Sequence, residues 1–161
     1  MSPVNNVTRF LDSKKVPYVA FETPPEKMGA RETAEFLKVP PDIIFKTIVV
    51  TRDTPKKPIL VVIPGPNVVD LKGLAAFLAE KKVYLPTERE AEQLTGLQAG
   101  GISPLALINK GFQVVVDSAA QNYFEIHVSG GQRGLNIKLP VADLVNLTKA
   151  RLALISRTEN S

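Results

Sequence analysis

Two apolar runs in the first half of the chain restrict its fold most. Thr47–Thr51 and Ile59–Ile63 are apolar at both odd and even positions, and Arg52–Lys57, with Asp53 and Pro55 as turn formers, joins them. A strand with one face in water alternates apolar and polar residues, whereas a strand covered on both faces does not. The sequence therefore predicts two central, neighbouring strands with other elements packed on both sides.

The other predicted elements include several strands in succession, so a regular strand–helix alternation is excluded. Because such strands pair as hairpins, the sheet must be mixed, and the fold class is α/β of the α+β type. No linker divides the chain, so residues 1–161 are expected to form a single domain. Helices are expected from Ser2-Pro3 to about Lys14, over Arg31–Lys38, from Asp70 to Glu80, from Thr87 to Gly96 and over Pro140–Lys149, with a helical turn at Pro40-Pro41-Asp42. Further strands are expected over Val16–Phe21, Val83–Leu85, Phe112–Asp117, Tyr123–Val128, 135–139 and Leu152–Ile155, followed by a frayed tail, Arg157–Ser161.

Local capping signals mark three of the helix starts. Asp70 is a good N-cap, because its carboxylate can accept a hydrogen bond from a free backbone N–H of the first turn. Thr87 and Glu90 have the T-x-x-E spacing of a capping box. Pro140 is expected at or near the first helical position, where its missing N–H costs nothing.

Residue counts exclude several kinds of catalytic site. The chain has no cysteine and one histidine, His127, so it has no disulfide framework, no thiolate nucleophile and no multi-histidine or cysteine-ligated metal site. Tyr123, Glu125 and His127 share the polar face of their predicted strand, which favours a surface or hydrogen-bonded histidine over a catalytic one. Catalysis would have to use lysine, carboxylates, hydroxyls, backbone dipoles or groups of the substrate. We expect no metal and no organic cofactor.

Charge and hydropathy indicate the kind of partner. A net charge of +4 favours an anionic partner, but the basic residues are spread in pairs and no DNA-recognition motif is visible. The longest apolar runs are strand-sized, and the N-terminus lacks the pattern of a secretory signal. We therefore expect a cytoplasmic protein with no membrane and no DNA partner.

Two glycine-rich loops are candidate functional segments. They are 100–104, which reads Gly-Gly-Ile-Ser-Pro, and 129–134, which reads Ser-Gly-Gly-Gln-Arg-Gly. Glycine is used where the backbone takes a positive φ or approaches another group closely. Two interpretations of these loops are open. They are ordinary connecting turns, or they form a site walled by backbone N–H and C=O groups.

Lys46 and Asn136 are the candidate polar side chains beside these loops. Lys46 opens an apolar strand, where a charge is costly unless it reaches solvent or a partner. It can extend its ammonium to water, or project into a pocket and hold an anionic or carbonyl group. Asn136 follows the second loop on the non-core face of its strand. Ser103 and Ser129 lie in the loops, but neither has the G-x-S-x-G context of a nucleophilic serine.

Four segments together resemble the YbaK/ProX family of trans-editing aminoacyl-tRNA deacylases, which is related to the insertion domain of bacterial prolyl-tRNA synthetase. They are 45–47, 69–72, 100–104 and 128–135, and the match covers nearly the whole chain in the same order. The resemblance implies a mixed, partly barrel-like sheet flanked by helices, with a small pocket for the aminoacyl end of tRNA. It also implies deacylation of Cys-tRNA(Pro), and of other Cys-tRNAs, with aminoacyl-tRNA and prolyl-tRNA synthetase as partners.

The resemblance also implies site residues and a mechanism. The thiol of the substrate cysteine attacks its own ester carbonyl, so the enzyme needs no nucleophile. Lys46, Gly100 and Gly101 correspond to the catalytic positions. The substrate-binding positions are Thr47, Met28, Phe21, Ile102, Ser103, Ser129, Gly131, Arg133 and Asn136.

Three departures from the family pattern bear on the substrate. Asn136 stands where aspartate is common, Phe21-Glu22-Thr23 replaces a Tyr-Glu-His run, and Met28 replaces an aromatic residue. They leave two alternatives open, a deacylase for alanine or another small residue, and a non-catalytic module that binds tRNA or prolyl-tRNA synthetase. The retained Lys46 and glycine loops favour an active enzyme.

Overall fold

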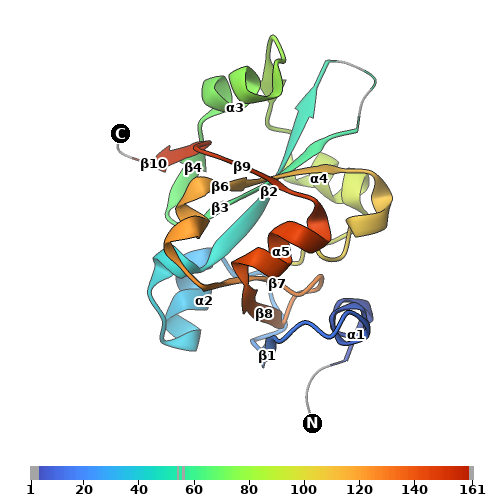
Figure 1. Cartoon of the computed structure of the whole chain (residues 1–161), viewed down its shortest axis with the longest axis vertical. Coiled ribbons are helices and arrows are strands. Elements are labelled where there is room, and N and C mark those ends of the chain that lie inside the picture. Colours follow the sequence, from blue (N-terminus) through green and yellow to red (C-terminus); the bar gives the residue numbers. More distant parts are fainter. Residues whose placement is uncertain (1–3, 54, 56, 160–161) are drawn as a thin grey trace.

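The fold is centred on a five-stranded mixed sheet (Figure 1). The computed structural model describes residues 4–53, 55 and 57–159. β2 runs antiparallel to both of its neighbours, β5 and β3, whereas β6 runs parallel to β3 and β9. The predicted mixed sheet is therefore confirmed. In spatial order the strands are β5 (Val83–Tyr84), β2 (Phe45–Arg52), β3 (Ile59–Pro64), β6 (Gln113–Asp117) and β9 (Arg151–Ala153).

Two smaller antiparallel sheets complete the strands. One has the order β1 (Val19–Glu22), β8 (Leu135–Pro140), β7 (Glu125–Ser129), and the other pairs β10 (Ser156–Thr158) with β4 (Asn67–Val69). An isolated parallel bridge between Ile44 and His127 links the start of β2 to β7. The strands of the described residues form three sheets and no closed barrel.

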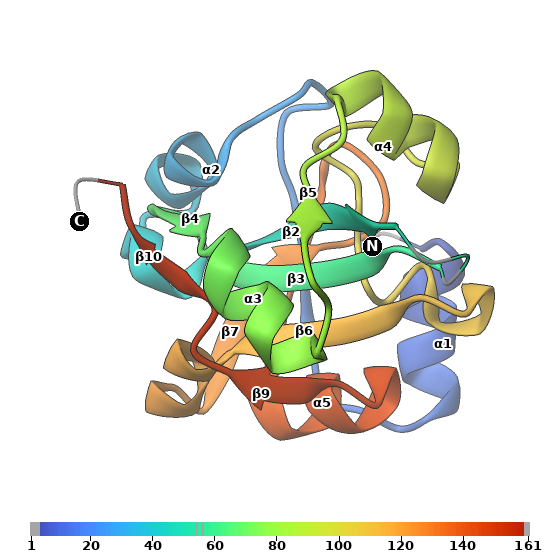
Figure 2. The same ribbon diagram turned by 90° about the horizontal axis from the view of Figure 1, so that it is seen from above.

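The main sheet is covered on both faces, as its apolar runs predict. Alternate residues of β3 enter two different clusters, because successive side chains of a strand point to opposite faces. Leu60 and Val62 pack with the second sheet, α1 and α5, whereas Val61 and Ile63 pack with α3. Figure 2 shows α2 and α4 at the β5–β2 edge of the sheet. The helices are α1 (Asn6–Ser13), α2 (Ala30–Leu37), α3 (Leu71–Leu78), α4 (Glu88–Thr95) and α5 (Val141–Thr148), with 3-10 turns η1 (Pro41–Ile43), η2 (Ile108–Lys110) and η3 (Ser118–Asn122).

The capping signals are confirmed in two helices. The Asp70 carboxylate accepts a hydrogen bond from Gly73 N at 3.0 Å and starts α3. Thr87 and Glu90 cap α4 reciprocally. Pro140 is the N-cap of α5, directly before its first residue Val141, so its expected position at or near the helix start is confirmed as well. The predicted start at Ser2-Pro3 lies outside the described residues, and α1 begins after the capping residue Asn5.

Three predictions at the strand ends are wrong. β4 was not expected, and its partner β10 includes Arg157 and Thr158, which the sequence placed in a frayed tail. The strand expected over Tyr123–Val128 starts only at Glu125, and Phe124, inside the predicted strand, precedes β7 and is 79% exposed. Short strands with two or three pairs carry too little period to be recognised from the sequence. Among the described residues, no helix has the length and apolar character needed to cross a membrane.

Candidate active site

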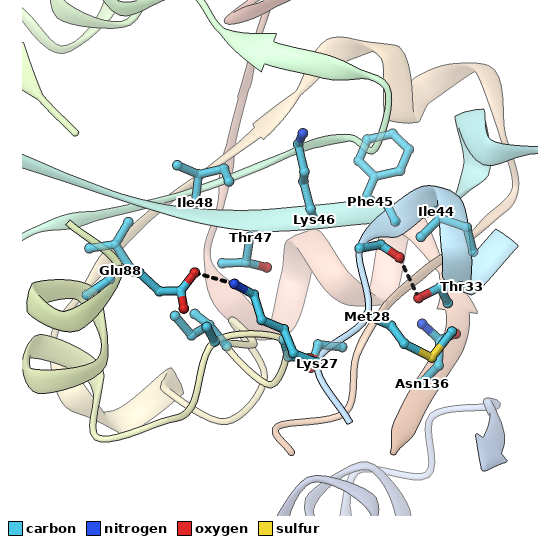
Figure 3. A pocket seen from close by; sticks show the side chains of 18 of the residues that line it. Lys27, Met28, Thr33, Ile44, Phe45, Lys46, Thr47, Ile48, Glu88 and Asn136 are labelled. Atoms are coloured by element: carbon cyan, nitrogen blue, oxygen red, sulfur yellow. Dashed lines mark hydrogen bonds and ion pairs between the residues drawn. The ribbon is translucent and has the colours of Figure 1, made fainter. Parts of the chain in front are cut away.

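A cavity of about 460 Å³ lies beside the part of β2 that β5 does not cover. Its other walls are the loop 23–29, the start of α4, the first glycine loop and the β7–β8 sheet. Figure 3 shows that the side chains lining it come from segments far apart in the sequence. Its volume is in the range that holds a small ligand.

The backbone of β2 supplies polar groups to this cavity. In an antiparallel ladder alternate residues direct their N–H and C=O groups toward the partner strand. Gly65 N donates to Ile44 O at 2.7 Å, which sets Lys46 and Ile48 as the residues that bond toward β3. Thr47 and Val49 therefore direct their backbone groups to the opposite edge, which β5 covers only at Thr51 and Arg52 in the next part of the strand. The cavity is therefore walled partly by the edge of β2 that faces away from β3.

The Thr47 side chain adds a hydroxyl to the same wall. Its Oγ1 is the one buried side-chain oxygen or nitrogen of the described residues without a hydrogen-bond partner. Leaving a buried polar group unpaired costs about 1–3 kcal/mol. A hydroxyl in this position is a natural contact for a bound polar ligand.

Lys46 lies at the rim of the cavity. Figure 3 shows its side chain extending from β2 on the side opposite to Thr47, together with Ile48. The side chain is half-buried, and it takes part in neither of the two salt bridges among the described residues. Burial lowers the pKa of Lys46, and the carboxylate of Glu159 opposes part of that effect. An ammonium that no salt bridge or hydrogen bond holds is available to an anionic ligand.

The two glycine loops pack against each other. A Cβ on Gly101 would lie 2.8 Å from Gln132 Cα and 3.1 Å from Arg133 N, so only glycine permits this approach. Arg133 Nε donates to Ala99 O at 2.7 Å and ties the loops together. Gly101 N donates to Gln98 O at 2.8 Å, so this N–H is already used within the loop. The loops thus hold Gly100 at the cavity wall.

His127 and Asn136 form a buried pair at the cavity wall, with Asn136 lining the cavity and His127 behind it. His127 is 1% exposed and Asn136 6% exposed, so the expected surface position of the histidine is wrong and its hydrogen-bonded alternative is right. His127 Nδ1 lies 2.7 Å from Asn136 Oδ1. The face is polar, but Phe21 stacks on the imidazole with a centroid distance of 5.5 Å and the chain before β2 bridges to His127. Burial lowers the pKa of His127.

Seven of the predicted site residues line this cavity, and five do not. Ser103 is fully buried, and its Oγ accepts a hydrogen bond from Leu105 N. Gly131 lines a different cavity near α1. Phe21 contacts His127, and Arg133 and Gly101 hold the two glycine loops together, so these three residues support the cavity wall from behind. The seven that line the cavity are Met28, Lys46, Thr47, Gly100, Ile102, Ser129 and Asn136.

Sequence reasoning missed an ion pair at the cavity. Lys27 Nζ contacts the carboxylate of Glu88, and Figure 3 shows the pair next to Thr47. The capping box marked the start of α4 and hence Glu88, but no sequence signal connects it with Lys27. Among the described residues, no three acidic or histidine side chains are grouped so that they could hold a metal ion.

Comparisons with known proteins agree with this architecture. Residues 24–147 match the model of the aminoacyl-tRNA editing domain. A protein of Enterococcus faecalis (strain ATCC 700802 / V583) named "Putative Cys-tRNA(Pro)/Cys-tRNA(Cys) deacylase EbsC" is 35% identical over 156 residues, which are 96% of this chain and 94% of that protein.

Two solved structures share the fold. The hypothetical protein APE2540 has a TM-score of 0.86 at 24% identity and covers 95% of this chain and 100% of its own. A "putative trans-editing enzyme for prolyl tRNA synthetase" has a TM-score of 0.77 at 21% identity and covers 96% of this chain and 99% of its own.

Proposed function

This chain belongs to the aminoacyl-tRNA editing domain family, and on that premise we propose that it removes cysteine from mischarged tRNA(Pro) and from other Cys-tRNAs. The relative from Enterococcus faecalis carries this specificity in its name. The bond broken is the ester between the amino acid and the terminal ribose. Aminoacyl-tRNA is thus the substrate, and tRNA and free cysteine are the products.

The observation that carries this proposal is the unpartnered wall of the cavity. Thr47 offers a buried hydroxyl without a partner on the edge of β2 that faces the cavity, which suits the amino or carbonyl group of a small acyl moiety. Asn136 borders the same space. Lys46 stands at the rim, where the ester joins the acyl group to the ribose. The acyl group therefore occupies the cavity, and the tRNA remains outside.

The reaction needs no nucleophile from the enzyme. The sulfur of the substrate cysteine forms a bond to its own carbonyl carbon, and the ester C–O bond breaks. The thiol proton passes to the leaving ribose oxygen, and water opens the resulting cyclic thioester. Holding reacting groups in attack geometry contributes about 7–11 kcal/mol in the best intramolecular cases. The Lys46 ammonium stabilises negative charge as it develops on the ester oxygens.

A deacylation assay with purified Cys-tRNA(Pro) tests the proposal. We expect Lys46→Ala to lower the rate about 100-fold or more, in the range seen when one group that stabilises the transition state is removed. Lys72→Ala, in the exposed first turn of α3, is the matched control and keeps the wild-type rate. Equal rates for wild type and Lys46→Ala would refute the assignment of Lys46.

A panel of charged tRNAs separates the alternatives. We expect Ala-tRNA(Pro) to be deacylated far more slowly than Cys-tRNA(Pro), because alanine has no thiol. Similar rates would overturn the thiol-assisted mechanism and favour a general deacylase of small aminoacyl-tRNAs. Binding of tRNA without any deacylation would favour a non-catalytic module.

Prolyl-tRNA synthetase is the partner we propose for this reaction. The scattered lysines of the chain suit weak, salt-dependent contact with tRNA, so the synthetase would supply the choice of tRNA. Addition of the synthetase is then expected to raise the rate on Cys-tRNA(Pro) and not on Cys-tRNA(Cys). We also propose that the protein is cytoplasmic, where this reaction takes place.

A further inference from the structure

A second cavity adjoins the candidate active site. It has a volume of about 370 Å³ and shares Gly29, Ala30 and Lys46 with the first cavity. The start of α2, the turn between β3 and β4, and the segment after β10 form the rest of its wall. Lys46 therefore borders two separate spaces, and Figure 3 shows its side chain on the side of β2 away from Thr47.

The second cavity carries two cations without direct partners. Arg31 and Lys46 line it, and neither forms an ion pair or a side-chain hydrogen bond with a described residue. Glu159 is the one carboxylate among its lining residues, and it lies beyond ion-pair distance of both cations. Two cations that no salt bridge holds, on a concave surface, attract a phosphate, and the guanidinium of arginine fits phosphate oxygens with two parallel hydrogen bonds.

The backbone brings these groups together. A Cβ on Gly65 would lie 2.4 Å from Ala30 Cβ and 2.9 Å from Ile44 O, so the β3–β4 turn packs directly on the start of α2. This contact places Arg31 of α2 beside Lys46 of β2 and Asn67 of β4 around one space. A larger residue at position 65 would separate these walls.

We propose that the second cavity binds the ribose and 5′-phosphate of the 3′-terminal nucleotide of the tRNA, with Arg31 as the main phosphate ligand. The inference rests on the proposed function, because it takes the acyl group to lie in the first cavity. An aminoacyl ester joins the acyl group directly to the terminal ribose. The 5′-phosphate is attached to the other side of the same ribose. The two adjoining cavities match this order, with Lys46 at the ester between them.

Glu159 opposes the charge of this ligand. Its carboxylate is exposed in the turn after β10, at the cavity wall. A phosphate bound near Arg31 and Lys46 experiences repulsion from Glu159, which weakens binding. Glu159→Gln removes the repulsion, and we expect it to lower the KM for Cys-tRNA(Pro).

Inhibition by two small molecules that resemble the end of the tRNA tests this site. The probes are adenosine and adenosine 5′-monophosphate, added to the Cys-tRNA(Pro) deacylation assay. We expect the monophosphate to inhibit wild type about tenfold more strongly than adenosine, and Arg31→Ala to abolish that difference. Arg89→Ala, in the exposed first turn of α4, is the control and keeps it.

The separate effects of Arg31→Ala on KM and on kcat give a second readout. Arg31 contacts the bound phosphate and not the reacting atoms, so Arg31→Ala raises KM about tenfold and leaves kcat unchanged. Equal inhibition of wild type by the two probes, or an unchanged KM in Arg31→Ala, would overturn the inference while leaving the proposed deacylation intact. If wild type deacylates no tRNA, the proposed function fails. Calorimetric titration with adenosine and with adenosine 5′-monophosphate then still decides whether the second cavity prefers the phosphate.

Discussion

The imidazole Nδ1 of His127 lies 2.7 Å from the amide oxygen of Asn136, and both side chains are buried. Burial lowers the pKa of His127 and so favours the neutral ring, and because an amide oxygen can only accept, the hydrogen of that ring is assigned to Nδ1, which donates to Asn136. That bond leaves the amide NH₂ of Asn136 for other partners. Since Asn136 lines the first cavity, we infer that His127 positions this amide donor at the site proposed for the acyl group.

The lowered pKa of His127 predicts a loss of stability in mild acid. The unfolded chain takes up a proton near pH 6.5, whereas the folded chain takes it up only at lower pH. The free energy of unfolding therefore falls as pH decreases through 6.5 and below. Urea unfolding at about pH 7.5 and about pH 5.5 measures this. His127→Gln should lose less stability than wild type over that interval, and an equal loss in both would contradict the prediction.

Asn136→Asp is expected to raise the pKa of His127. A carboxylate at hydrogen-bond distance favours the imidazolium and opposes the effect of burial. Because the chain has one histidine, its ring-proton NMR signal reports this pKa without assignment work. The variant also replaces an amide donor by a negative charge at the cavity, so the ratio of Cys-tRNA to Ala-tRNA deacylation should change. An unmoved NMR titration and an unmoved ratio would show that Asn136 has no such role.

The sequence predicted those features that depend on local signals. The T-x-x-E box at Thr87 and the N-cap Asp70 placed helix starts because capping involves residues three apart. The double-sided burial of β3 followed from its unbroken apolar run. The residues alone marked Lys46 and the loop 100–104 as candidates, and the resemblance gave Lys46, Gly100 and Gly101 catalytic roles, but neither could show that Gly101 uses its N–H within the loop.

Other features depend on contacts between distant segments and left no mark in the sequence. The burial of His127 arises because Phe21 and the residue before β2 cover a face that reads as polar. The ion pair of Lys27 with Glu88 joins a loop to a helix that lies 61 residues further along. The second cavity at Lys46 depends on the packing of Gly65 against Ala30. Alternation and capping describe a segment, whereas these relationships describe how segments meet.

Gly101→Ala should destabilise the protein and impair the site. The added methyl group meets the backbone of Gln132 and Arg133, which cannot move aside as a flexible side chain can. Overpacking of this kind costs about 1–3 kcal/mol and would shift Gly100 away from the cavity. The readouts are urea unfolding and the deacylation rate. Gly96→Ala is the control, because its Cβ meets nothing within 4 Å and only its positive φ of 74° adds strain. A deacylation rate as high in Gly101→Ala as in the control would contradict the loop's role.

Lys46→Met is expected to stabilise the protein while abolishing activity. Burial lowers the pKa of Lys46 in the folded chain below the usual value of about 10.4. The unfolded chain therefore holds this proton more tightly, and the charge opposes folding at neutral pH. The stabilisation by Lys46→Met should shrink as pH rises toward 10.4, because wild type gains stability there. Unfolding curves at neutral pH and at about pH 10 measure the difference. A destabilised Lys46→Met at neutral pH would contradict this assignment.

Thr47→Val gives the sharpest separation between folding and function. The Thr47 hydroxyl is buried without a partner in the folded chain, whereas water hydrogen-bonds to it in the unfolded chain. Replacing it with a methyl group of similar shape removes that penalty, so we expect the free energy of unfolding to rise by about 1 kcal/mol. If the hydroxyl binds the acyl group, the same variant raises KM for Cys-tRNA(Pro) or lowers kcat about tenfold, since a bound polar group loses its partner. Thr51→Val, on the same strand where β5 covers the edge, is the matched control and keeps the wild-type rate. A variant at position 47 that is more stable and equally active would show that the hydroxyl has no contact with the substrate.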